Sequence, residues 1–284
     1  MYKLVIRSIL LKYRIFFFLF VLLTSAVIAS AANDPVAAWL FNKKGNTVKD
    51  ISGNGHDGKI SGKVEWIKDG RFDGALSFEG KDGWIEVKNH KDFHFPKGTD
   101  FTLACWVKIT GDHAQPPMLV AKSYGLQGQK QPWYALYYAN QGKQSDGDVS
   151  FFCRDAGGQS FHIAAGQKIN DEKWHHVVGT RAKGTMYLYL DGVIKSEKKD
   201  ADFDVGTHDG DLHMMTHANR FMNAVLDEVV IYKGKALSIE EINQLMKSGT
   251  EAFLSVSAKE KIAATWGGLK LAYHSKQSTK SRPR

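Results

Sequence analysis

The sequence predicts an all-β protein, a sandwich of two sheets followed by one short helix. Three observations carry this prediction. Short runs of alternating apolar and polar residues recur along the chain at the spacing typical of sandwiches, with turn residues between them. The body shows one strong helical pattern, and its strands do not alternate with helices as in a parallel sheet. A single β-rich domain commonly occupies about 200 to 250 residues, which suits a chain of 284 residues.

The predicted strands follow one another from residue 75 to residue 232. Two tight turns, Lys183-Gly184 and Asp191-Gly192, separate the later ones. Asp-Gly suits a type I′ turn, since both central residues need a positive φ. The predicted strands are residues 75–80, 83–87, 101–109, 118–122, 133–139, 148–154, 174–181, 185–196 and 224–232.

The helix is predicted in the sequence LSIEEINQLMKSG, residues 237–249. Ser238 stands three residues before Glu241, the spacing of a capping box. Apolar residues recur at helical spacing after Ser238, and Gly249 is suited to end the helix. A second helix is expected over residues 257–266.

Both ends of the chain differ from its body. Four basic residues precede an apolar run at residues 15–23, and the small-x-small site Ala29-Ser30-Ala31 follows. This order predicts a secretory signal peptide over residues 1–31, and therefore export, to the cell surface, the periplasm or the medium. The alternative is an uncleaved N-terminal anchor. We expect residues 34–249 to form the domain, and residues 250–284 to be an extension with a basic, disordered end.

The charge of the body argues against nucleic acid as a ligand. The formal net charge is +8, but the signal segment holds four basic residues and residues 270–284 hold five, without an acid in either. The remaining 29 basic and 30 acidic residues leave a body of charge −1. A nucleic-acid-binding domain would present a basic face instead.

The two cysteines, Cys105 and Cys153, each lie in an alternating strand pattern on the apolar side, so both are expected in the core. In an exported protein they could form a disulfide. Two buried free thiols are the equal alternative.

A glycine-rich loop, DISGNGHDGKISG at residues 50–62, raises the question of a metal. Asp50, Ser52 and Asn54 followed by Gly55 match the opening of an EF-hand calcium loop. The glutamate expected at position 12 is replaced by Ser61, so calcium would need another carboxylate. Otherwise the loop is a turn whose polar side chains bond their own backbone.

Asp227 and Glu228 are candidates for that carboxylate, because they interrupt the apolar strand AVLDEVVIY. A carboxylate among apolar neighbours is unfavourable unless it is paired, hydrogen-bonded or bound to a metal. The alternative is that both acids accept backbone N–H bonds near the strand end.

Several of these stretches occur together in a recognisable order: DISGNGHDGKISG, GALSFEG, FTLACWV, WHHVVGTRAKGTMYLYLDG and LDEVVIYKGKALSIEEINQLMKSG. Over residues 34–249 the chain resembles the laminin-G-like domains of the concanavalin A-like lectin/glucanase superfamily, in their bacterial secreted form. The resemblance implies an antiparallel jelly roll, but no single function, because this fold hosts many. It also implies calcium held between the loop and the late strand. The implied calcium ligands are Asp50, Asn54, Asp227 and the carbonyl groups near Gly53 and His56, with Asn42 as a further candidate.

The chain departs from the family pattern at residues 211–221, DLHMMTHANRF. His213 and His217 have the i, i+4 spacing that suits a metal on a helix, but Met214 stands where a zincin has glutamate. Because a strand is expected here and not a helix, the two histidines are not expected to bind a metal. His175 and His176 match a family position that is structural.

No catalytic residue is predicted. Glycosidases on this fold use carboxylates closely spaced on one strand, and no such motif occurs in the sequence. The densest acidic run, residues 197–204, follows a hairpin and holds one glutamate.

A binding site is suggested by the aromatic stretch at residues 130–148. Aromatic faces stack on sugars and amides bind their hydroxyl groups. Strand alternation puts Trp133 and Tyr137 on one face and Tyr134 and Tyr138 on the other, so at least one pair is core. The candidate ligand-binding residues are Gln131, Trp133, Tyr134, Tyr137, Tyr138 and Asn140.

The sequence therefore predicts an exported, non-catalytic module that binds a glycan or a surface polymer and is stabilised by calcium. A protein-protein adhesion module is the first alternative. A glycoside hydrolase with a non-standard carboxylate pair is the second.

Overall fold

The computed structural model describes residues 34–111, 117–123, 132–138 and 147–256. The chain divides into two units, Pro35–Phe253 and a second unit made of Met1–Asp34 and Leu254–Arg284. The fold below is that of the first unit. The expected signal peptide and the expected helix at 257–266 lie outside the described residues, as do Gln131 and Asn140.

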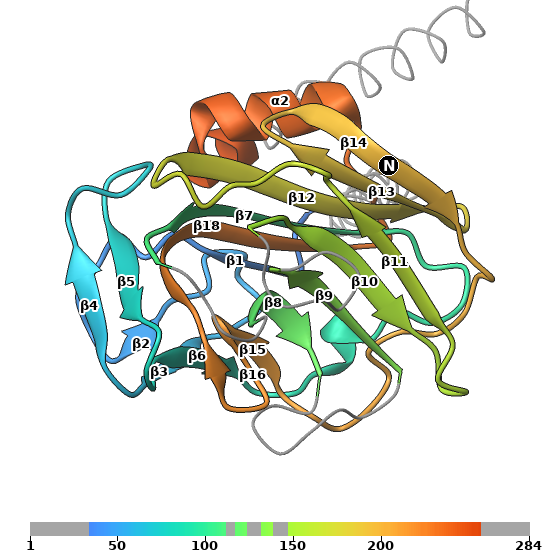
Figure 1. Cartoon of the computed structure of the whole chain (residues 1–284), viewed down its shortest axis with the longest axis horizontal. Coiled ribbons are helices and arrows are strands. Elements are labelled where there is room, and N and C mark those ends of the chain that lie inside the picture. The colour runs from blue at the N-terminus through green and yellow to red at the C-terminus, as the bar shows by residue number, and fades with distance from the viewer. Residues whose placement is uncertain (1–33, 112–116, 124–131, 139–146, 257–284) are drawn as a thin grey trace, which may run out of the picture. The chain divides into compact units, whose positions relative to one another are not determined.

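Two eight-stranded antiparallel sheets form the first unit (Figure 1). The first sheet has the order β14-β13-β12-β7-β18-β5-β4, and β1 also pairs with β18. Its strands are β1 (Ala37–Trp39), β4 (Val64–Ile67), β5 (Ala75–Glu79), β7 (Phe101–Ile109), β12 (Trp174–Ala182), β13 (Thr185–Leu190), β14 (Val193–Lys199) and β18 (Asn223–Lys233).

The second sheet has the order β11-β10-β9-β8-β15-β6-β3-β2. Its strands are β2 (Thr47–Val48), β3 (Gly58–Ser61), β6 (Trp84–Val87), β8 (Met118–Lys122), β9 (Trp133–Tyr137), β10 (Ser150–Arg154), β11 (Ser160–Ala164) and β15 (Leu212–Met214). A two-stranded ribbon of β16 (Thr216–His217) and β17 (Arg220–Phe221) follows β15.

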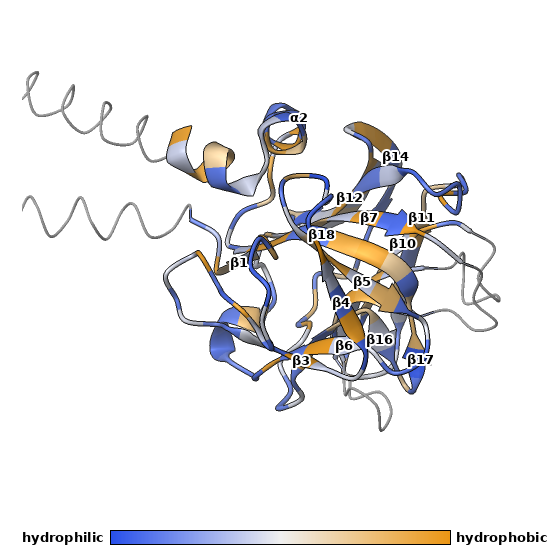
Figure 2. Ribbon diagram, turned by 90° about the vertical axis from the view of Figure 1, so that its left-hand side faces the viewer, coloured by the Kyte–Doolittle hydropathy of each residue, from blue (hydrophilic) through white to orange (hydrophobic). Residues whose placement is uncertain are grey.

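The hydrophobic core lies between the two sheets, because alternate residues of each strand point the same way. On β7 the inward residues are Phe101, Leu103, Cys105, Val107 and Ile109, and all are buried in one cluster with Phe151 and Cys153 of β10. Figure 2 shows hydrophobic stretches along the strands of both sheets, with hydrophilic residues in many of the loops. The predicted two-sheet, all-β sandwich is confirmed.

The two predicted hairpin turns have the expected backbone. Lys183 and Gly184 have φ values of 49° and 72°, and Asp191 and Gly192 have values of 52° and 75°. Positive φ at both central residues is the requirement of a type I′ turn. The second turn divides the predicted strand at 185–196 into β13 and β14.

The helix α2 (Ile239–Ser248) begins where the capping box predicted it. The Ser238 hydroxyl accepts the Glu241 N–H, and the Glu241 carboxylate accepts the Ser238 N–H. Gly249 ends the helix with φ 75°. The Asn243 side chain bonds the Gly192 carbonyl, which places α2 beside the β13–β14 turn (Figure 1). A further helical segment starts at residue 250 and is described to residue 256.

Both cysteines are buried and free, so the disulfide is not formed in this structure. Cys105 belongs to the first sheet and Cys153 to the second, and both side chains point into the core. Burial raises the pKa of the Cys105 thiol to about 12 and raises that of Cys153 as well. Each thiol therefore serves as a small apolar group.

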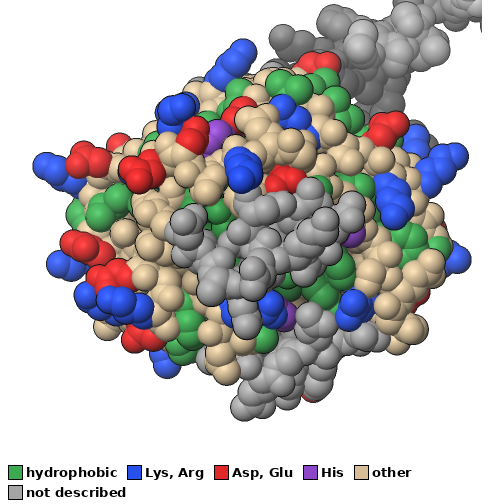
Figure 3. All heavy atoms as spheres, viewed as in Figure 1, with side chains coloured by type: hydrophobic (Ala, Val, Ile, Leu, Met, Phe, Trp, Pro, Cys, Tyr) green, Lys and Arg blue, Asp and Glu red, His purple; other side chains and the backbone are tan. Residues whose placement is uncertain are grey.

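The surface carries both signs of charge. On the face viewed in Figure 3, basic and acidic side chains are interspersed, in agreement with the near-neutral body of the sequence. Within the part of the chain that the structure describes, no helix combines the length and the apolar character needed to cross a membrane.

Candidate functional site

The loop at residues 50–57 is organised by the carboxylate of Asp50. Its Oδ1 accepts the N–H groups of Ala38 at 3.0 Å and Ser52 at 2.9 Å. Its Oδ2 accepts the His56 N–H at 3.0 Å and the Ser52 hydroxyl at 2.8 Å. A carboxylate offers about four lone-pair positions, so these four donors occupy Asp50 fully.

The other predicted loop ligands are also engaged within the fold. The Asn54 amide donates to the carbonyl oxygens of Val36 at 3.0 Å and Pro35 at 3.3 Å. The His56 carbonyl accepts the Trp39 indole N–H at 2.9 Å. Gly53 has a φ of 89°, a conformation suited to glycine in a turn. These hydrogen bonds are the ones expected of the self-bonded turn, and calcium binding by the loop stays a prediction.

Asp227 bonds a different segment. Its Oδ2 accepts the N–H groups of Arg71 at 2.8 Å and Phe72 at 3.0 Å, and its Oδ1 accepts the Glu228 N–H at 2.8 Å. Burial raises the pKa of Asp227 to about 8, against the lowering effect of these N–H donors. Glu228, with a φ of 51°, accepts the Thr250 N–H at the start of the last helical segment.

Asp50 and Asp227 share no hydrogen-bond partner among the described residues, because Asp50 bonds residues 38, 52 and 56 and Asp227 bonds residues 71, 72 and 228. Asp227 alone retains features that suit a cation. A Cβ placed on Gly70 would lie 2.9 Å from Asp227 Oδ2 and 2.7 Å from the Gly74 carbonyl oxygen, so two oxygens face one small space. The Gly74 N–H in turn donates to the Asn42 side chain at 3.3 Å. A buried carboxylate beside a carbonyl oxygen is a suitable start for a calcium site.

The aromatic stretch divides as strand alternation predicts. Tyr134 and Tyr138 lie in the core between the sheets, where the Tyr134 hydroxyl bonds the Phe93 carbonyl at 3.1 Å. The two residues are 0% and 1% exposed, so they are corrected from ligand-binding to core residues. Trp133 and Tyr137 lie on the opposite face of the second sheet, in a separate cluster with Met118 and Ala121.

The register of the second sheet builds a row of side chains across that outer face. Directly paired residues point to the same side of a sheet. The row runs from β11 to β6 and is His162, Phe152, Ala135, Ala121, His213 and Glu86. We call it the cross-strand row. Its two central members, Ala135 and Ala121, carry only a methyl group, and both are buried.

Trp133 stands beside this row and stacks on Phe152, with ring centroids 4.2 Å apart and planes 20° apart. The Arg154 guanidinium lies over both rings, 5.8 Å from the Trp133 centroid and 5.6 Å from that of Phe152. The His217 ring also stacks on Trp133, with ring centroids 6.0 Å apart. This arrangement combines flat apolar surface with polar hydrogen-bonding groups.

Within the described part of the chain, two buried polar atoms in this group lack a hydrogen-bond partner. The Trp133 indole N–H is buried and has no hydrogen-bond acceptor among the described residues, and the same holds for His213 Nδ1. A buried polar atom without a partner is costly by about 1 to 3 kcal/mol. An acceptor supplied by a ligand or by water would remove that cost.

The histidines around the row are held neutral. Burial lowers the pKa of His217 to about 4, and Arg220 adds to this effect. Burial also lowers the pKa values of His162 and His213. Near neutral pH these rings are therefore uncharged and can each donate one hydrogen bond and accept another.

His213 and His217 lie on two short strands, β15 and β16, and not on a helix, in agreement with the predicted strand. His175, on β12, bonds Asp191 at 2.8 Å and Asp171 at 3.0 Å, so it links the β13–β14 turn to the segment before β12.

Sequence reasoning missed Phe152, Arg154 and His162 in the outer face. Strand alternation through Phe151 and Cys153 carries the signal, since it turns Phe152 and Arg154 away from the core. It also missed the contacts of the His56 ring. Its Nε2 atom lies 2.9 Å from Asp92 Oδ2, and the ring packs against that of His90. Nothing in the sequence links these positions, which lie more than 30 residues apart.

Comparison with known proteins places the fold. A family model described as the concanavalin A-like lectin/glucanases superfamily matches residues 79–243. No curated protein sequence gives a significant match.

Several solved structures share the fold at low sequence identity. The binding domain of Paraclostridial mosquitocidal protein 1 has a TM-score of 0.61 and 17% identity, and the match covers 76% of this chain and 52% of that one. The botulinum neurotoxin serotype D ligand binding domain, in complex with N-acetylneuraminic acid, has a TM-score of 0.59 and 16% identity, covering 78% and 53%. The chain thus spans about half the length of these two domains.

Domain 4 of AbnA, an extracellular arabinanase from Geobacillus stearothermophilus, was solved in complex with arabinotriose. It has a TM-score of 0.59 and 17% identity, with 75% of this chain and 98% of that domain covered.

Proposed function

Because this chain belongs to the concanavalin A-like lectin/glucanase superfamily, we propose that it is an exported, non-catalytic module that binds a glycan or a related surface polymer. The ligand lies on the outer face of the second sheet, over the cross-strand row. The observation that carries the proposal is the Trp133–Phe152 stack with Arg154 over both rings.

The chemistry of this face suits a sugar. A pyranose or furanose ring has an apolar C–H surface, which packs on aromatic rings, and a rim of hydroxyl groups, which need donors and acceptors. The half-buried Phe152 provides the first requirement, and Trp133, which is only 3% exposed, packs against its ring. Arg154, the neutral His162 and the unpartnered Trp133 N–H provide the second.

The relatives of similar fold support a sugar or a receptor as ligand. One is bound to arabinotriose and another to N-acetylneuraminic acid, and a third is the binding domain of a mosquitocidal protein. We therefore take arabino-oligosaccharides and sialylated glycans as the first probes, within a broader glycan array.

The test is retention of the full chain on such an array, with Phe152→Ala and Arg154→Gln as variants. Both residues are half-buried, so their replacement should leave the fold intact. We expect each variant to lose at least tenfold in affinity for the glycan that the natural chain retains. Tyr187→Ala, at a half-buried tyrosine of the first sheet, is the matched control and should bind as before. Retention of no glycan, or equal binding by all variants, would contradict the proposal.

We also propose that calcium stabilises the domain, at Asp227 rather than at Asp50. The buried Asp227 carboxylate, the facing Gly74 carbonyl oxygen and the nearby Asn42 side chain support this choice. Bound calcium would supply a positive charge that stabilises the ionised form of the Asp227 carboxylate, which burial disfavours.

A further inference from the structure

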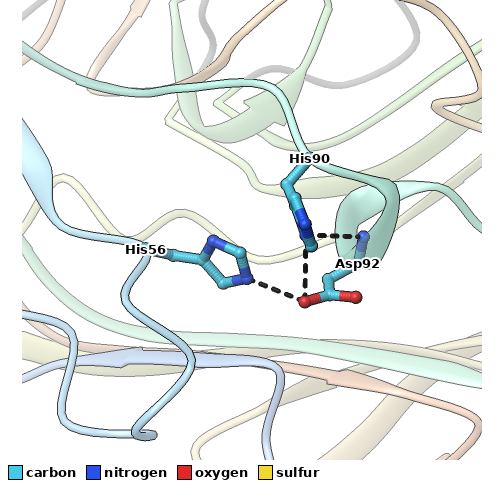
Figure 4. Close-up of side chains that lie close together, drawn as sticks. All are labelled: His56, His90 and Asp92. Atoms are coloured by element: carbon cyan, nitrogen blue, oxygen red, sulfur yellow. Dashed lines mark hydrogen bonds and ion pairs between the residues drawn. The ribbon is translucent and has the colours of Figure 1, made fainter.

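A cluster of three metal-binding side chains lies apart from the outer face and from Asp227. Figure 4 shows His56, His90 and Asp92 with their side chains directed at one another. The ligand atoms of the three residues all lie within 4.8 Å of one another. The His56 Nε2 atom is 2.9 Å from Asp92 Oδ2, and the His90 Nδ1 atom is 3.0 Å from the same oxygen.

The hydrogen bonds within this cluster are incomplete without a cation. His90 Nδ1 accepts the Asp92 backbone N–H at 3.3 Å, as the N-cap of the short helix η1 (Lys91–Phe93). An imidazole nitrogen carries either a lone pair or a proton. His90 Nδ1 therefore cannot accept this N–H and also donate to the Asp92 carboxylate. A metal ion among the three atoms would take the place of the proton between His56 and Asp92, and the His90 Nδ1 lone pair would bind the ion instead of the Asp92 N–H.

The cluster is also held in place before any ion binds. The His56 N–H bonds Asp50 and its carbonyl bonds Trp39, so the backbone of this residue is fixed on both sides. Its ring lies between His90 and Phe93, each with a centroid distance of 4.8 Å. The His56 side chain is 8% exposed, whereas that of His90 is 45% exposed, so an ion has access from the solvent side.

The ligand types favour one class of metal. Imidazole nitrogens with one carboxylate oxygen suit Zn²⁺, whereas calcium and magnesium take oxygen ligands. Ligands of a tetrahedral zinc at about 2.0 to 2.1 Å are separated by about 3.4 Å. The 2.9 and 3.0 Å separations from Asp92 therefore need only a small adjustment, whereas the two imidazole nitrogens, which lie within 4.8 Å of each other, would have to move together by up to about 1.4 Å.

We propose that His56, His90 and Asp92 form a zinc-binding site that joins the loop at residues 50–57 to the segment at residues 90–92. Three protein ligands leave the fourth position of the ion to water or to an exchangeable oxygen ligand. The ion replaces the protons between the three side chains, and it fixes the loop by linking it to η1.

The test is titration of the chelator-treated full chain with Zn²⁺ alone, followed by calorimetry and by metal analysis after gel filtration. We expect one zinc per chain and a rise in melting temperature at saturation, because a ligand of the folded state stabilises it. Cobalt(II) in place of zinc should give the absorption of a four-coordinate ion.

Two variants remove ligands while sparing the fold. His90→Asn retains an N-cap acceptor for the Asp92 N–H, and Asp92→Asn keeps the side-chain shape. Each should weaken zinc binding at least tenfold. His94→Asn is the matched control, because that histidine lies in the same segment but bonds Asn89 instead. Failure to bind one zinc, or equal affinity in all the variants, would overturn the proposal.

Discussion

The carboxylate of Asp50 accepts the backbone N–H of His56 at 3.0 Å, across a loop that holds Gly53 and Gly55 at positive φ. The residue with the sequence position of a first calcium ligand therefore acts as the centre of a turn. Through that turn, Asp50 sets the position of the His56 ring beside Asp92 and His90. In this chain, a sequence pattern typical of metal-binding loops forms a turn that positions neighbouring side chains.

Replacing Asp50 should destabilise the domain. Asp50→Ala removes the acceptor of three backbone N–H groups, and we expect a loss of about 3 kcal/mol in the free energy of unfolding. Urea denaturation followed by tryptophan fluorescence measures this loss. Asp155→Ala, at an exposed turn where the carboxylate accepts the Gln159 N–H, should lose less than about 1 kcal/mol. Similar losses in the two variants would show that Asp50 does not organise its loop.

Calcium should raise the melting temperature through Asp227. Calcium at 100 times its dissociation constant adds about 2.7 kcal/mol, which corresponds to several degrees for a domain of this size. Differential scanning calorimetry with calcium and with chelator measures the change. We expect the rise to be absent in Asp227→Asn and present, from a lower starting temperature, in Asp50→Asn. If only the Asp50 variant abolishes the rise in melting temperature, the calcium site lies in the loop at residues 50–57 and not at Asp227.

The buried histidines should make the domain sensitive to acid. Burial lowers the pKa values of His208 and His217 to about 4, below the unfolded value of about 6.5. The unfolded state then binds more protons, so stability is present above pH 6.5 and falls as the pH drops toward 4. Each histidine contributes on the order of 2 kcal/mol to this fall.

Urea denaturation at several pH values between 7 and 4 measures this slope, and chelator in every buffer removes any metal contribution. His208→Asn should reduce it, because asparagine can still accept the Gly210 N–H but does not titrate. An unchanged slope in this variant would contradict the assignment.

Reducing agent should leave stability unchanged. Cys105 and Cys153 are buried free thiols, so there is no disulfide to reduce. We expect the same melting temperature with and without dithiothreitol, and two thiols per chain in a thiol assay under denaturing conditions. A fall of several degrees in reducing agent, with no free thiol before it, would show that the two residues pair. In that case Cys105→Val, which cannot form the disulfide, is the control whose melting temperature should not respond to reducing agent.

The sequence by itself determined the elements and the alternation of their faces. Period-2 patterns, the Asp191-Gly192 turn and the Ser238–Glu241 capping box depend on contacts within a few residues, so the chain order alone predicts them. The same alternation separated Trp133 and Tyr137 from Tyr134 and Tyr138.

Only the tertiary structure decided which of these faces is core and which partner each carboxylate has. Tyr134 is buried because β9 pairs within the second sheet and turns that side toward the first. Asp227 bonds residues 71 and 72, about 155 positions earlier in the chain, and His56 meets Asp92 across 36 positions. Such contacts arise from strand pairing and loop closure between distant segments, and local residue patterns carry no information about them.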